Sequence, residues 1–156
     1  MMKTMRLWIA ALGSALLASC GQVSIPTDYT QSSAFPSIYP DYVNVTIPVN
    51  IAPLTFEADQ PADEMVASYA VGDQMVVCRG QMQPELDEWR ALTAKAKGAS
   101  IKVDVYLRKD GQWTRFKPFN LYVSPDSIDP YISYRLIPPS FVTYETLTIN
   151  QRCLEN

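Results

Sequence analysis

Histidine is absent from the sequence. It is the commonest general base near neutral pH, the usual ligand of catalytic zinc and the ordinary proximal ligand of haem. Most hydrolase and redox mechanisms therefore lack the side chain on which they depend. We expect a protein that is not an enzyme and that holds no cofactor and no metal. A chain of 156 residues also has room for only one domain.

The sequence lacks an apolar run long enough to cross a bilayer, which takes about 20 residues. The longest such run, residues 7–18, has twelve residues and follows the basic residues Lys3 and Arg6. This pattern is typical of a secretory signal peptide. The ending Leu17-Ala18-Ser19-Cys20 resembles the bacterial lipobox, in which the cysteine is lipidated and the preceding peptide is removed. The alternative is a plain cleaved signal with an incidental cysteine.

A surplus of basic residues is missing as well. The formal net charge is −3, and removal of residues 1–19, which hold two bases and no acid, changes it to −5. Nucleic-acid binding needs a concentrated cationic surface, so we exclude nucleic acid as a partner. In the lipoproteins that this start resembles, a Gly such as Gly21 after the anchor directs the protein to the outer membrane. The absence of an acidic cluster in residues 21–27 then predicts that the domain faces the periplasm.

Only three cysteines are present. With Cys20 lipidated, Cys78 and Cys153 remain in an oxidising compartment, where a disulfide would close a loop of roughly 76 residues and contribute ~4 kcal/mol of stability. The alternative is two buried thiols, because Cys78 ends an apolar run in which a free cysteine packs like a small hydrophobe. Neither cysteine begins a CxxCH haem-attachment motif.

The composition divides the chain into three parts. Residues 1–19 form the signal peptide, residues 20–42 a lipidated flexible tether, and residues 43–156 the domain. The tether is rich in Ser, Thr, Gln and Pro and buries too little to order itself. Its isolated aromatic residues either pack on the flank of the domain or recruit a partner.

Alternation of apolar and polar residues predicts strands over most of the domain. They cover residues 43–49, 51–56, 66–71, 74–79, 132–137 and 141–149, with two more inside residues 100–123. Pro84 and Gly98 bound one predicted helix whose apolar side carries Trp89 toward the core, or alternatively toward a ligand. The expected fold class is mainly β, an antiparallel, β-sandwich-like pair of sheets with one short α-helix.

The turn pair Asp110-Gly111 predicts a tight hairpin with Lys109 opposite Gln112. This register places Leu107 opposite Thr114 and Val105 opposite Phe116 on the buried face. On the outer face it pairs Arg108 with Trp113, Tyr106 with Arg115, and Asp104 with Lys117, two cation–aromatic contacts and one ion pair.

The outer face of this hairpin is therefore a basic and aromatic strip on an acidic protein. It is our candidate partner-binding site, and it consists of Lys102, Tyr106, Arg108, Trp113, Arg115 and Lys117. Aromatic residues with arginine are typical of surfaces that recognise a protein partner, and a carbohydrate is the second candidate. The alternative is a solvated sheet face that these same pairs stabilise.

Two acidic groups fit neither a metal site nor catalysis. The acids of residues 57–64 lack the spacing of an organised calcium loop, and a solvated acidic loop explains them. Asp126 and Asp129 lie beside prolines, where Asp initiates turns, and no further acid or nucleophile accompanies them.

Three segments carry a resemblance to a known family. Residues 39–56, with the run Val45-Thr46-Ile47-Pro48-Val49-Asn50-Ile51-Ala52-Pro53, residues 128–137 and residues 149–152 resemble the amino-terminal region of a family of Gram-negative envelope lipoproteins. In that family a TolB-like β-propeller and CxxCH motifs follow, and a role in cytochrome c biogenesis is often given. This chain ends before any such segment, so the haem-related role is not carried over.

Together these observations predict a lipid-anchored, non-catalytic binding or docking module of the cell envelope. The resemblance implies that this module is the amino-terminal part of a TolB-like propeller lipoprotein. The membrane, through its anchor, and a protein are the expected partners. The alternatives are an envelope redox or cytochrome c biogenesis accessory protein and a carbohydrate-binding module.

Overall fold

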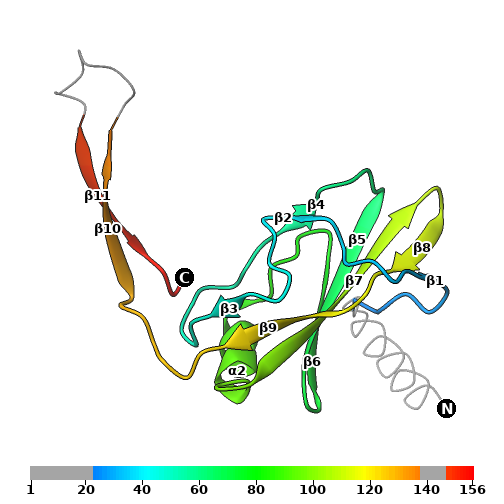
Figure 1. Ribbon diagram of the computed structural model, residues 1–156, viewed down its shortest axis with the longest axis horizontal. Coiled ribbons are helices and arrows are strands. Elements are labelled where there is room, and N and C mark those ends of the chain that lie inside the picture. Colours follow the sequence, from blue (N-terminus) through cyan, green and yellow to red (C-terminus); the bar gives the residue numbers. More distant parts are fainter. Residues whose placement is uncertain (1–22, 138–146) are drawn as a thin grey trace, which may run out of the picture.

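A computed structural model describes residues 23–137 and 147–156 of the chain (Figure 1). The predicted signal peptide, Cys20 and most of the strand predicted over residues 141–149 lie outside these ranges. The described part is mainly β with one helix, which confirms the predicted fold class. No helix in it is long and apolar enough to span a membrane.

Seven strands form the main sheet, in the order β1-β8-β7-β5-β6, with β9 also paired to β7 and β3 paired to β9. Their bounds are β1 Thr30–Gln31, β3 Thr46–Ile47, β5 Glu64–Val71, β6 Gln74–Arg79, β7 Ser100–Lys109, β8 Gln112–Arg115 and β9 Phe119–Val123. Pairing is antiparallel except for β1 with β8 and β3 with β9, so the sheet is mixed. Two small antiparallel ladders join β2 (Ile38–Tyr39) to β4 (Glu57–Ala58) and β10 (Tyr131–Leu136) to β11 (Thr148–Cys153).

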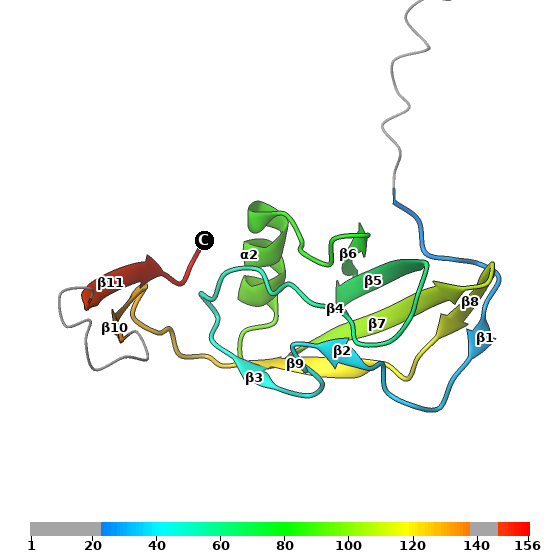
Figure 2. The ribbon, with the colours of Figure 1, turned by 90° about the horizontal axis from the view of Figure 1, so that it is seen from above.

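The core lies between one face of the main sheet and α2 (Leu86–Lys95), which packs across it (Figure 2). Alternate residues of β5 and β7 point into this layer, as the period of two requires. From α2, Trp89 and Leu92 enter it and are fully buried. The core-facing interpretation of Trp89 is thus confirmed, although α2 is shorter than the predicted residues 84–98.

The turn between β7 and β8 forms as predicted. Asp110 and Gly111 both have positive φ, 51° and 81°, which is the backbone of the two-residue turn that Asp-Gly favours. The register places Lys109 opposite Gln112, Leu107 opposite Thr114 and Tyr106 opposite Arg115. Local turn chemistry has therefore fixed which side chains share a face.

The segment predicted as a flexible tether contributes to the domain instead. β1 pairs with β8, β2 pairs with β4, and Ile38 is buried in the core. The boundary of the domain therefore lies before residue 43. Tyr29, Phe35 and Tyr42 follow the first of the two alternatives and pack on the flank of the domain, whereas Tyr39 is 66% exposed.

Candidate functional site

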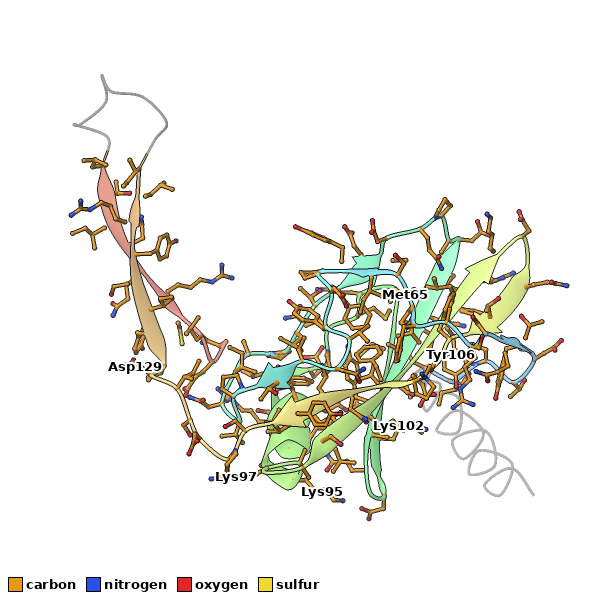
Figure 3. The ribbon with its side chains drawn as sticks, viewed as in Figure 1. Met65, Lys95, Lys97, Lys102, Tyr106 and Asp129 are labelled. Atoms are coloured by element: carbon orange, nitrogen blue, oxygen red, sulfur yellow. The ribbon has the colours of Figure 1, made fainter. Side chains whose placement is uncertain are left out.

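The predicted strip on β7 and β8 is covered by the chain itself. Tyr29 packs edge-on against Tyr106 with 5.4 Å between ring centroids, and Phe35 lies 4.5 Å from Lys117 Nζ. As a result only 4% of Tyr106 is exposed. Figure 3 shows Tyr106 among crowded side chains where the first described residues meet the sheet. The strip is therefore not an open aromatic surface.

Arg115 is the centre of this covered region. Its guanidinium donates to Asp104 Oδ1 from Nε at 2.9 Å and from Nη2 at 2.5 Å, and it lies over the rings of Tyr29 and Tyr106. The predicted contact between Tyr106 and Arg115 is thus confirmed. Asp104 has only 7% of its surface exposed. The hydrogen bonds that Arg115 donates to Asp104 raise the pKa of Arg115, and burial raises the pKa of Tyr106.

The register places Arg108 opposite Trp113 as predicted, but other partners replace the cation–aromatic contact expected between them. Arg108 binds Glu64 at 3.3 Å, and Trp113 is instead covered by the guanidinium of Arg79 at 5.8 Å. Both partners come from β5 and β6, which the sequence could not place beside the hairpin. Arg108 remains about half exposed, as does Lys102.

The predicted pair of Asp104 with Lys117 is wrong because the register changes after β8. Val103 lies opposite Phe119, where the β7–β8 register would have placed Pro118. Proline has no N–H for a ladder, so a local bulge accommodates it. The Lys117 amide donates to Ala34 O at 2.9 Å, and Asp104 takes Arg115 and Lys102 as its partners.

Among the described residues, exposed apolar side chains gather on the β10–β11 hairpin, which projects from the body (Figures 1 and 2). Tyr134 is 46% exposed, Leu136 57% and Ile149 80%. Every residue of β10 is exposed. A two-stranded hairpin is marginally stable by itself in water, and monomeric proteins rarely expose apolar residues in such a row. The hairpin is the feature that the sequence analysis missed as a site.

The base of the hairpin is fixed to the body. Asn50 brackets the backbone of Ile128, donating from Nδ2 to its oxygen at 2.9 Å and accepting from its nitrogen at 3.0 Å. Nδ2 also donates to Glu155 Oε1 at 2.7 Å. On the other strand, Ala52 N donates to Leu154 O at 2.7 Å. Asp129 marks this base in Figure 3. The hairpin is therefore a fixed arm rather than a loose end.

The predicted disulfide between Cys78 and Cys153 is not formed, and both cysteines are free. Cys78 faces the core from β6, whereas Cys153 ends β11 at the base of the projecting hairpin. The two strands belong to different sheets that never pair. The alternative, two buried thiols, is correct for Cys78 alone, because Cys153 is only partly buried.

This difference in burial predicts different thiol chemistry. Burial, assisted by Glu88 and Glu85, raises the pKa of the Cys78 thiol to about 11. A pKa of about 11 in place of 9 lowers the fraction of Cys78 thiolate, the reactive form, about a hundredfold at pH 8, and the higher nucleophilicity of the more basic thiolate offsets about tenfold of this. We therefore expect Cys78 to react with iodoacetamide roughly tenfold more slowly than Cys153. Single-thiol variants Cys78→Ser and Cys153→Ser separate the two rates by mass spectrometry.

The same pKa predicts a loss of stability in alkali. The folded pKa lies above the ordinary value of 9, so the folded state favours the protonated thiol. This contribution is complete below pH 9 and is lost as the pH rises toward about 11. The Cys78→Ala variant should lack this part of the decline in stability. Equal alkylation rates of Cys78 and Cys153 would show that the pKa of the Cys78 thiol is not raised.

The described residues hold little that suggests a reaction. They contain no group of three or more His, Cys, Asp or Glu placed to hold a metal ion. The open hollow beside β2 and β4, about 350 Å³, is lined by Tyr39, Pro40, Thr55, Phe56, Glu57, Gly80, Gln81 and Met82. Glu57 is its one ionisable carboxylate and has no basic residue beside it in that lining.

The chain matches no protein-family model, no curated protein and no solved structure.

Proposed function

We propose that the protein is a lipid-anchored, non-catalytic docking module of the cell envelope, held at the outer membrane and facing the periplasm. The observation that carries the docking role is the β10–β11 hairpin, which exposes an apolar row while Asn50 and Leu154 fix its base. Fixing the arm before binding lowers the conformational entropy lost on binding. Such an arm suits a protein partner.

The anchor is supported by the lipobox-like ending at Cys20 and by the start of the ordered domain. β1 begins at Thr30, ten residues after Cys20, which limits the reach from the membrane to about 35 Å. A tether extending to residue 42 would have allowed roughly twice that distance. The body is thereby held close to the membrane, with its arm within reach of other envelope proteins.

We expect radiolabelled palmitate to enter the wild-type protein and to be lost in Cys20→Ala. For the docking role, a photoreactive phenylalanine analogue replaces Tyr134 on the hairpin, and Tyr122 on β9, 45% exposed, is the matched control. Irradiation of cells should give a covalent protein adduct at residue 134, identified by mass spectrometry, and none at residue 122. Absence of any protein adduct at residue 134 would refute the docking role.

A further inference from the structure

The open hollow beside β2 and β4 has an exposed aromatic ring in its lining. Tyr39 of β2 is 66% exposed, more than any other aromatic residue in the described part of the chain. Ile38 points into the core, so Tyr39, the next residue of the strand, points away from it. Glu57, which also lines the hollow, lies directly opposite Tyr39 in the β2–β4 ladder (Figure 1). The ring and the carboxylate therefore share one outward face.

The walls of the hollow are fixed by hydrogen bonds to the body. The β2–β4 ladder holds the wall that carries Tyr39. On another wall, Gly80 N donates to Met65 O at 3.1 Å, and the buried hydroxyl of Tyr69 donates to Met82 O at 3.0 Å. Gly80 has a positive φ of 77°, and a Cβ at this position would meet no atom within 4 Å, so its backbone is open to a ligand. Fixed walls lower the entropy that binding costs.

Two amide side chains extend the hollow toward the start of α2. Gln81 lines both this hollow and a second one of about 290 Å³, which Gln83 also lines. Gln81 Nε2 donates to Gln83 Oε1 at 2.9 Å, so each amide orients the other. Among the described residues, Gln81 Oε1 and Gln83 Nε2 have no further hydrogen-bond partner. One acceptor and one donor are thus available to the hydroxyl groups of a ligand.

The charges of the lining oppose an acidic ligand. Glu57 in the first hollow and Glu85 in the second are the charged residues of the two linings, and neither lining holds a base. Cys78 faces the core, so Arg79, the next residue of β6, faces away from it and binds Glu64 at 3.1 Å. A phosphate or carboxylate ligand would meet only repulsion from these two acids.

From these observations we propose that the hollow binds an uncharged glycan, with one sugar ring stacked on Tyr39. A sugar ring has apolar C–H faces, which pack on an aromatic ring, and a rim of hydroxyl groups that both donate and accept. The hydroxyls of the stacked ring donate to the carboxylate of Glu57. The next sugar lies past Gln81 in the second hollow. The volume of the first hollow, about 350 Å³, falls in the usual range of small-ligand sites.

NMR titration of the isotope-labelled full chain, in a detergent without a sugar headgroup, tests the site. The probes are cellotriose, chitotriose and maltotriose at millimolar concentrations, whose equatorial hydroxyls leave the ring faces free to stack. At least one should bind and shift the amide signals of Gly80 and Gln81. Trigalacturonate, an anionic trisaccharide, should bind more weakly because its carboxylates meet Glu57.

Substitutions of Tyr39 test the stacking. Tyr39→Ala should weaken binding of the uncharged trisaccharide roughly tenfold, and Tyr39→Phe should keep most of the affinity because the ring remains. Tyr122→Ala is the matched control, since Tyr122 on β9 is 45% exposed and lines neither hollow. Its affinity should equal that of wild type. Both tyrosines are exposed, and circular dichroism checks that the variants are folded.

Glu57→Gln tests the charge apart from the shape of the site. The variant keeps an acceptor oxygen, so binding of the uncharged trisaccharide should fall less than in Tyr39→Ala, whereas trigalacturonate should bind more tightly than to wild type. Failure of all three uncharged probes to bind, equal affinity in Tyr39→Ala, or a preference of wild type for trigalacturonate would each overturn the proposal. The docking role of the hairpin is tested at residue 134 and would stand in any of these cases.

Discussion

Trp89→Ala is expected to destabilise the fold by about 3–5 kcal/mol. Trp89 is fully buried, and its ring packs edge-on against Tyr69 with 5.9 Å between centroids. The substitution leaves a cavity between α2 and the sheet. It also removes the hydrogen bond that Trp89 Nε1 donates to Ile51 O at 2.8 Å. For a chain of this size the melting temperature should fall by roughly 10 °C or more. Chemical denaturation monitored by circular dichroism measures the loss.

Trp89→Phe is the matched control. It keeps most of the ring volume and loses the indole donor, so it should cost about 1–2 kcal/mol. Ile51 lies between Asn50 and Ala52, the two residues that hold the hairpin base, so both variants should also speed hydrogen exchange at the Leu154 amide. Equal losses of stability in the two variants would show that the cavity contributes nothing.

The hairpin of β7 and β8 was predictable because its determinants are local. Asp110 and Gly111 suit the turn, and the alternation from Ile101 to Leu107 assigns the faces. A shift of one residue would have exposed the aliphatic row. The predicted register extends to Phe116, whose amide donates to Val105 O at 3.0 Å. It fails past that residue, where Pro118 displaces the register by one residue. The placing of β5 and β6 beside the hairpin, which decides the partners of Arg108 and Trp113, has no local signal.

The covering of the strip could not be inferred from the composition of residues 23–42. Tyr29 and Phe35 are isolated among polar residues and show no period, so their packing on the strip depends wholly on a surface that is distant in the sequence. The projecting hairpin was hidden for a related reason. Ile132, Tyr134 and Leu136 alternate just as core strands do, and a pattern of period two does not say whether its apolar face meets a core or solvent.

Arg115→Ala is expected to have the second largest effect, a loss of about 2–4 kcal/mol. The substitution removes both hydrogen bonds to Asp104, whose carboxylate is buried and keeps only Lys102 at 3.4 Å. A buried charge without its partner carries a desolvation penalty that an exposed one does not. The variant also takes away the cation that lies over Tyr29 and Tyr106. Guanidinium denaturation gives the free energy of unfolding.

Arg108→Ala is the control for this second prediction, because Arg108 forms a half-exposed pair with Glu64 at 3.3 Å and should cost at most about 1 kcal/mol. The double variant Asp104→Ala/Arg115→Ala should recover part of the loss, since no buried carboxylate is then left without its guanidinium.

Hydrogen exchange distinguishes local release of the segment that carries Tyr29 from global unfolding. The Ser32 amide donates to Arg115 O, so release of this segment should speed exchange at Ser32 more than at residues of β5. If Arg115→Ala and Arg108→Ala cost the same, Asp104 is solvated in the folded state, and the segment that carries Tyr29 is held by its strand pairing with β8 alone.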